Sequence, residues 1–158
     1  MMFKNVFVIF GFLAVCYAAA GVGVLLSWDA IPTWYVGLNK PSWNPPNWVF
    51  GPVWMVLYTM MAIAAWRVWK QGDNRGARMA LWLFWLQLIL NVAWSGVFFG
   101  LRQPDWAFLE IVILWLAILA TALAFRKFSR FAFWMMIPYL AWVGFAAVLN
   151  LTIWRMNA

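Results

Sequence analysis

Five long apolar runs constrain the fold of this chain more than any other feature. A helix needs roughly 20 apolar residues to cross the hydrocarbon core of a bilayer, and five runs reach that length. These runs cover residues 5–27, 48–69, 79–100, 106–126 and 131–154. Hydrophobic residues make up 68% of the chain and charged residues only 9%, so a water-soluble fold of this composition would expose large apolar patches. The sequence therefore predicts an all-α membrane protein, a single domain over residues 1–158 built as a bundle of five transmembrane helices.

Lysine and arginine are divided unequally between the two ends of this predicted bundle. Eight of them fall at one end, namely Lys4, Arg67, Lys70, Arg75, Arg78, Arg126, Lys127 and Arg130. Three fall at the other end, namely Lys40, Arg102 and Arg155. Because loops rich in Lys and Arg stay on the cytoplasmic side, we expect a cytoplasmic N-terminus, an outside C-terminus and a location in the bacterial inner membrane. No basic face with interleaved polar residues accompanies the net charge of +7, so we expect no nucleic-acid partner.

The first run also has features of a secretory signal peptide. Lys4 supplies a basic region before it, and Ala18-Ala19-Ala20 offers a small-residue cleavage pattern. The apolar run continues through Leu26, however, which is longer than the apolar part of a typical signal peptide. We therefore favour a helix that stays in the mature protein.

The chain lacks most of the side chains that carry acid–base and metal chemistry. It has no histidine, four acidic residues and one cysteine, and histidine is the commonest general base and metal ligand. We therefore expect no metal site, no required cofactor and no conventional hydrolase, and we expect Cys16 to be a buried free thiol. Glu110 is the only acid inside a run and is a functional candidate by default. Pairing with Arg102 or extension toward the nearby outer interface is the interpretation we favour.

The tryptophans separate into two groups by depth. Eleven of the fifteen lie near the ends of the runs, where tryptophan gathers at the membrane–water interface. The deeper ones are Trp54, Trp94, Trp115 and Trp142. For Trp115, which is flanked by leucines, we favour packing or lipid contact.

Polar and aromatic residues recur on one face of three runs. They are Trp54 and Tyr58 in the second run, Gln87, Asn91, Trp94 and Ser95 in the third, and Pro138, Trp142, Ala146 and Asn150 in the fifth. Polar side chains at such depth normally face the bundle interior. These faces indicate one aromatic cavity that suits a flat, mostly apolar ligand, with Asn91 or Tyr58 satisfying its few polar atoms. Hydrogen bonding between neighbouring helices is the alternative interpretation.

The connection over residues 28–47 is the only sizeable one that is not apolar. Pro41, Pro45 and Pro46 restrict its backbone, so we expect it to hold one shape as a lid over the cavity. Pro138 is expected to kink the fifth helix and open room beside Trp142. In the third run Gly96 and Gly100 form a GxxxG motif, which predicts either a homodimer seam or a close contact within one chain.

Three strings in these regions resemble the signature of the tryptophan-rich sensory protein family, which includes the mitochondrial translocator protein, or peripheral-type benzodiazepine receptor. The first is WY-x-x-L-x-KPSWxPPxWVFGPVWxxLY, which ends at Tyr58. The others are Asn91-x-x-Trp94-Ser95-x-x-Phe98-Phe99 and Ile137-Pro138-Tyr139-x-x-Trp142. The resemblance covers essentially the whole chain, and the first string is long enough to be highly specific.

The resemblance implies a five-helix membrane bundle, commonly dimeric, with a pocket under the first loop. Members bind protoporphyrin IX, haem and drugs of the benzodiazepine and isoquinoline classes, as ligands rather than as required cofactors. By motif match the ligand-binding positions are Tyr35, Pro45, Trp54, Tyr58, Asn91, Trp94, Trp142 and Ala146. Some bacterial members are credited with light- and oxygen-dependent degradation of protoporphyrin IX, in which Trp54 and Trp142 would be the catalytic positions. Animal members also carry a C-terminal cholesterol motif, but the corresponding segment 149–155 lacks its tyrosine, so we do not expect tight sterol binding.

Three hypotheses follow. The favoured one is a receptor or sensor that binds tetrapyrroles, with a role in their transport or in stress-dependent regulation. The second is an enzyme that photo-oxidises porphyrin without a metal or histidine. The third is a structural membrane protein that assembles with lipid and with a second copy of itself through Gly96 and Gly100.

Overall fold

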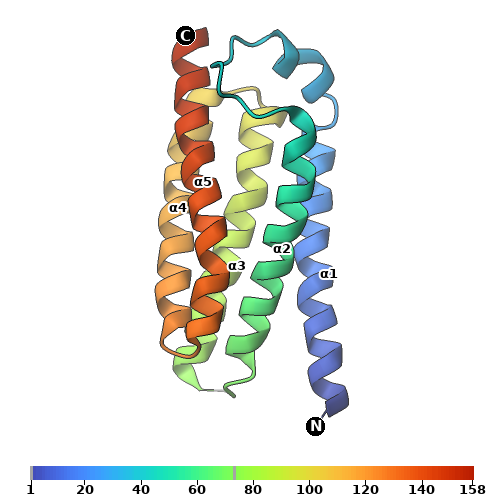
Figure 1. Ribbon diagram of the computed structural model, residues 1–158, viewed down its shortest axis with the longest axis vertical. Helices are drawn as coiled ribbons and strands as arrows, with labels where there is room; N and C mark the ends of the chain where they lie inside the picture. The colour runs from blue at the N-terminus through green and yellow to red at the C-terminus, as the bar shows by residue number, and fades with distance from the viewer. Residues whose placement is uncertain (1, 73) are drawn as a thin grey trace.

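The computed structural model describes residues 2–72 and 74–158, and these form a bundle of five long helices (Figure 1). The helices are α1 (Met2–Ser27), α2 (Asn47–Trp69), α3 (Arg75–Ser95), α4 (Pro104–Arg126) and α5 (Arg130–Asn157). Two π-helical turns accompany them, η1 (Ile31–Tyr35) in the loop after α1 and η2 (Gly96–Gly100) at the end of α3. The described ranges contain no strand. The all-helical prediction is confirmed, and each predicted run agrees with a helix to within about one turn.

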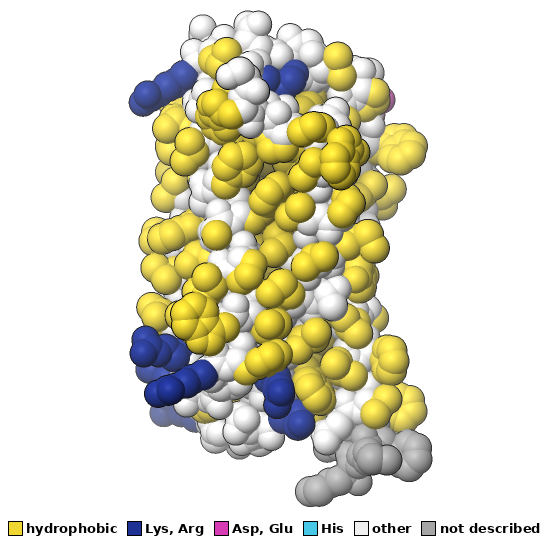
Figure 2. All heavy atoms as spheres, viewed as in Figure 1, with side chains coloured by type: hydrophobic (Ala, Val, Ile, Leu, Met, Phe, Trp, Pro, Cys, Tyr) yellow, Lys and Arg dark blue, Asp and Glu magenta, His cyan; other side chains and the backbone are white. Residues whose placement is uncertain are grey.

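All five helices are long and apolar enough to cross a membrane. Their outward faces carry large apolar side chains, such as Phe7, Leu25 and Ile89, which are two-thirds or more exposed. Figure 2 shows apolar side chains along the length of the molecule, with Lys and Arg gathered near its two ends. Such a surface needs a lipid solvent, so the protein is an integral membrane protein. The two termini lie at opposite ends of the bundle (Figure 1); which end faces the cytoplasm stays a prediction, and the Lys4 side chain lies outside the described ones.

Local sequence signals set the helix boundaries. The side chain of Asn74 accepts a hydrogen bond from the backbone N–H of Ala77 (2.8 Å) at the start of α3, and Ser129 does the same for Ala132 (3.2 Å) at the start of α5. These caps satisfy N–H groups that have no partner within the helix. Pro104 occupies the first position of α4, where its missing N–H costs nothing.

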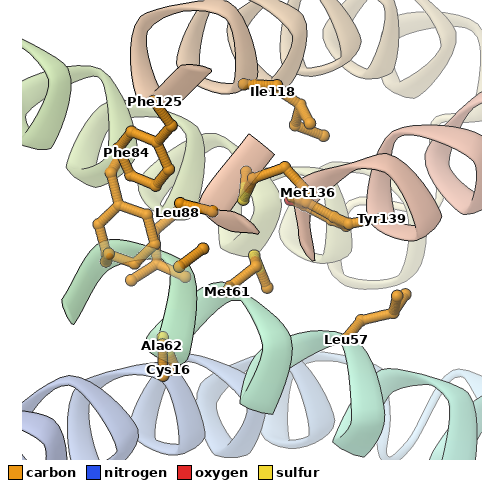
Figure 3. Packing of buried hydrophobic residues seen from close by; sticks show 14 of the residues in the cluster. Cys16, Leu57, Met61, Ala62, Phe84, Leu88, Ile118, Phe125, Met136 and Tyr139 are labelled. Carbon is orange, nitrogen blue, oxygen red and sulfur yellow. The ribbon is translucent and has the colours of Figure 1, made fainter. Parts of the chain in front are cut away.

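The helices pack in the order α1, α2, α5, α4, α3 and back to α1 around the bundle. At their centre a cluster of buried side chains joins all five, and Figure 3 shows part of it. Cys16 of α1 is fully buried and lies beside Ala62 of α2, which confirms the predicted buried thiol. Phe84 of α3 stacks on Phe125 of α4, with 6.2 Å between the ring centroids.

The GxxxG motif makes a close contact within the chain. A Cβ atom on Gly96 would lie 3.7 Å from Leu26 Cδ1, and one on Gly100 would lie 4.0 Å from the Leu26 carbonyl oxygen. The two glycines thus let the end of α1 approach η2, as the intramolecular alternative predicts. Association of two copies through this motif stays a prediction.

Candidate ligand-binding site

A chain of hydrogen bonds crosses the interior and joins three helices. The Tyr58 hydroxyl of α2 donates to Asn91 Oδ1 of α3 (2.6 Å), and Asn91 Nδ2 donates to the Tyr139 hydroxyl of α5 (2.8 Å). The Tyr139 hydroxyl donates in turn to Gln87 Oε1 (2.9 Å). All four side chains are buried. Because an unpaired polar group is costly away from water, this chain ties α2, α3 and α5 together.

Trp54 lies against the two tyrosines of this chain. Its ring centroid is 5.6 Å from that of Tyr58 and 6.2 Å from that of Tyr139. The structure therefore brings Trp54, Tyr58 and Asn91 together, as the sequence predicts. Tyr139 was not among the predicted site residues, although it is fully buried at the centre of the chain. Its position three residues before Trp142, in the Ile137-Pro138-Tyr139 string, is the signal that could have identified it.

Two more predicted residues meet nearer the loop end of the bundle. Trp94 stacks on Phe98 at 5.1 Å, and its indole N–H donates to Asn150 Oδ1 (3.1 Å). The Tyr35 ring also packs here, with its centroid 6.3 Å from that of Phe98 and 5.7 Å from that of Phe99. These residues form a second buried cluster beneath the loop.

An apolar groove of about 580 Å³ runs between α2 and α5. Its walls are Pro52, Val53, Val56, Leu57, Met60, Pro138, Ala141, Trp142 and Phe145. Pro52 and Pro138 are the prolines inside their helices, and each removes one backbone hydrogen bond and disturbs the helix around it. The open space expected beside Trp142 is therefore present, and it is bounded by both prolines.

Trp142 connects this groove to the aromatic residues near the loop. Its ring lies 5.8 Å from that of Phe50 and 5.6 Å from that of Phe145. Of the eight predicted ligand-binding residues, Trp142 is the one that lines the groove, while Tyr35, Pro45, Trp54, Tyr58, Asn91, Trp94 and Ala146 do not. Pro45 and Ala146 are half-buried. Ala146 packs against the central core, while the Pro45 carbonyl accepts a hydrogen bond from Asn44 Nδ2 (3.0 Å) within the loop.

The loop over residues 28–47 lies across one end of the bundle (Figure 1), and Lys40 holds its first half together. Lys40 Nζ donates to the carbonyl oxygens of Tyr35 (2.7 Å) and Leu38 (2.9 Å) and sits 4.8 Å from the centre of the Tyr35 ring. The Tyr35 hydroxyl donates to Asn44 Oδ1 (3.1 Å). Burial raises the pKa of Tyr35 above its usual value, although the hydrogen bond with Asn44 acts in the opposite direction.

Two further contacts fix the loop to α5. The backbone N–H of Asn39 donates to Asn157 Oδ1, and Asn157 Nδ2 donates to the Asn39 carbonyl, both at 2.9 Å. Trp43 packs on Phe145 with 5.8 Å between ring centroids, and Phe145 is also part of the groove wall. The loop and the groove are thus connected through one aromatic side chain.

Glu110 does not make the ion pair expected from the sequence. Both of its carboxylate oxygens are buried and have no hydrogen-bond partner among the described residues, so neither pairing with Arg102 nor extension toward the interface is correct. Arg102 instead lies 3.8 Å from Asp29 of the loop. The reason is geometric: Arg102 has a positive φ of 57° in the turn before α4, and its side chain meets the loop.

The site offers apolar and aromatic surface rather than acid–base groups. Its hydroxyl and amide groups already bond to one another, and the described residues include no group of three or more His, Cys, Asp or Glu side chains placed to hold a metal ion. The arrangement therefore favours stacking and burial of a flat apolar molecule.

Comparisons with known proteins agree with this architecture. The sequence profile of the TspO/MBR family matches residues 12–155. The chain is 40% identical to the tryptophan-rich protein TspO of Chlorobaculum tepidum, over 92% of both proteins. It is 40% identical to the tryptophan-rich sensory protein of Cereibacter sphaeroides, over 92% of this chain and 89% of that protein, and 44% identical to the human translocator protein, over 78% and 75%. The chain therefore belongs to the TspO/MBR family of membrane proteins.

Proposed function

We propose that this protein is a membrane receptor for flat, mostly apolar ring systems, with tetrapyrroles such as protoporphyrin IX and haem as its main ligands. The observation that carries the proposal is the apolar groove between α2 and α5 with Trp142 in its wall. Drug molecules of the benzodiazepine and isoquinoline classes share the same flat aromatic character. The proposed location is the bacterial inner membrane, with a role in porphyrin transport or stress-dependent regulation.

The groove sets how such a ligand would be bound. Its walls are apolar side chains from two helices, so the ligand gains free energy by leaving contact with lipid headgroups and water and by stacking on Trp142. The groove lies between two spanning helices, so the ligand reaches it from within the bilayer. A homodimer formed through Gly96 and Gly100 is part of this proposal, and it leaves the α2–α5 groove of each copy accessible.

The test is a titration of the purified protein with protoporphyrin IX in the dark, following quenching of tryptophan fluorescence. We expect saturable quenching in the natural protein and at least about tenfold weaker binding in Trp142→Ala, because a large stacking surface is lost. Trp82→Ala is the matched control, since Trp82 is 69% exposed on the outer face of α3 and lies outside the groove. Equal affinities for all three proteins, or no saturable quenching at all, would reject the proposed site.

A second candidate function is photo-oxidation of the bound porphyrin, and the packing of Trp54 on Tyr58 and Tyr139 favours it. In this reaction the porphyrin absorbs light and is oxidised, dioxygen is reduced, and Trp54 and Trp142 relay electrons. Illumination of the same sample in air distinguishes the two functions. Loss of porphyrin absorbance that the Trp54→Phe/Trp142→Phe variant abolishes indicates degradation, whereas stable absorbance after saturable binding indicates a receptor.

A further inference from the structure

A second groove lies at the opposite end of the bundle from the loop, between α3 and α4. It has a volume of about 370 Å³, within the range of about 300–1,000 Å³ that is typical of small-molecule sites. It is lined by Gly76, Met79, Ala80, Leu83, Ala120, Leu123, Ala124, Lys127 and Phe128. None of these residues belongs to the candidate ligand-binding site.

Small residues create this groove, and large ones form its rim. Ala80, Ala120 and Ala124 leave space between the two helices. A Cβ atom on Gly76 would lie 3.0 Å from the Phe128 ring, so the glycine allows that ring to close one end. Met79 and Leu123 are 60% and 48% exposed on helices that span the membrane, so the groove opens toward lipid.

Basic residues lie at this end of the groove. Lys127 lines it directly, and Arg75 immediately precedes Gly76 at the start of α3. The helix dipole adds partial positive charge at the start of α3. Among the described residues this end of the bundle carries no acidic side chain, because Asp29, Asp105 and Glu110 all lie toward the loop end; Asp73 lies outside the described residues.

We propose that this groove binds one membrane phospholipid with an anionic headgroup. One acyl chain lies along the apolar floor, and the phosphate of the headgroup is bound by Lys127 at the rim. The combination of an apolar channel and a cation at a membrane boundary fits both parts of such a lipid. A second copy of this chain is a poorer occupant, because a parallel neighbour would bring its own basic end against this one.

Other cations at this end are placed differently. Arg67 lies 4.8 Å from the Phe131 ring centre, Lys70 lies 4.4 Å from that of Trp66, and Arg126 lies 5.7 Å from that of Phe133. Each of these cations packs on an aromatic ring. Lys127 is the cation that lines the groove, which makes it the residue to change.

The experiment is native mass spectrometry of the detergent-purified protein with increasing phosphatidylglycerol or phosphatidylcholine. We expect one phosphatidylglycerol to bind more tightly than phosphatidylcholine, and Lys127→Gln to weaken phosphatidylglycerol about fivefold while Lys127→Arg retains it. Ala120→Trp should remove the binding of both lipids, because Ala120 is exposed and lines the groove. Ile113→Trp is the matched control, since Ile113 is 49% exposed on the same helix outside the groove.

Each outcome bears on the proposal. Equal affinity for the two lipids, or phosphatidylglycerol binding that neither Lys127→Gln nor Ala120→Trp changes, would overturn it. Competition by inorganic phosphate or glycerol phosphate as strong as that by the intact lipid would also overturn it, because the acyl chain would then contribute nothing. If Ala120→Trp loses helix content by circular dichroism, the pair Lys127→Gln and Lys127→Arg decides, since Lys127 is exposed at the end of α4.

Discussion

Asn91 is the residue on which the interior hydrogen bonds converge. It accepts a hydrogen bond from Tyr58 and donates one to Tyr139, so its replacement removes two hydrogen bonds at once. We expect Asn91→Leu to leave both hydroxyls poorly satisfied, at about 1–3 kcal/mol each, and to lower the thermal midpoint in detergent by about 5 °C or more. Circular dichroism during heating measures this change.

Tyr58→Phe provides the comparison for that variant. It removes one hydroxyl and one bond, so its effect should be smaller. Combined with Asn91→Leu it should add almost nothing, because the two residues share the same bond. Full additivity of the two substitutions would show that the hydrogen-bond chain does not act as one unit.

Tyr35 makes the loop sensitive to alkaline pH. Burial raises the pKa of its hydroxyl above the usual value of 10.0, so an unfolded loop loses this proton at lower pH than the folded one. The contribution of Tyr35 to loop stability is therefore complete below about pH 10 and falls as the pH rises above it. We expect proteolysis of residues 28–47 to accelerate above pH 10 in the natural protein. In Tyr35→Phe that pH dependence should be weaker, although cleavage at neutral pH should be faster because the bond to Asn44 is lost.

At the residue scale, sequence spacing predicted the helix face on which a side chain lies better than it predicted the residues that the side chain contacts. The i, i+4 spacing of Trp54 and Tyr58 placed them on one face, and the structure shows them in contact. Spacing within a helix carries no information about the conformation of the turn that precedes it, which is why the expected pairing of Glu110 with Arg102 was wrong. Spacing did not predict which side chains would line the groove, because of the predicted ligand-binding residues Trp142 alone is among its walls.

Among the elements, α5 carries the feature that shapes the groove. Pro138 lies inside this helix and costs it about 3 kcal/mol relative to alanine. We expect Pro138→Ala to raise the thermal midpoint, because the missing backbone hydrogen bond is restored, and to weaken protoporphyrin IX binding, because a straighter helix narrows the groove. Heating curves and dark fluorescence titrations on the same samples measure both effects.

Pro104→Ala is the control at a helix start. Pro104 occupies the first position of α4, where proline is well tolerated, and it lies outside the groove. Its replacement should change neither the thermal midpoint nor the affinity for protoporphyrin IX by much. If Pro138→Ala behaves like Pro104→Ala, the groove does not depend on Pro138.

Helix bounds followed from the sequence, but the π-helical turns did not. The apolar runs and their flanking polar residues sufficed to place α1 to α5, because lipid demands long uninterrupted helices. The turns η1 and η2 depend on contacts between distant segments, such as Tyr35 with Phe98 and Leu26 with Gly96. Such contacts produce no periodic pattern in the sequence, so the sequence could not predict the π-helical turns.

For the whole molecule, the distribution of Lys and Arg predicts which end faces the cytoplasm. In a Cys16→Ser background, a single cysteine at Val36 or at Gln71 reports the two ends, since both positions are exposed. The excess of Lys and Arg at the Gln71 end predicts that a membrane-impermeant maleimide labels intact cells at position 36 and leaves position 71 unlabelled until the membrane is opened. Labelling at position 71 alone would reverse the proposed orientation.

The interior hydrogen bonds also divide the bundle into a stiff part and a compliant part. Hydrogen bonds among the side chains of Tyr58, Asn91 and Tyr139 join α2, α3 and α5. By contrast, only a small fraction of α1 is buried. Its side-chain hydrogen bonds to α2 run from Tyr17 to Thr59 and from Trp66 to the Asn5 carbonyl, and neither involves Tyr58, Asn91 or Tyr139. We therefore expect α1 to move relative to the rest of the bundle more readily than α2, α3 or α5 moves.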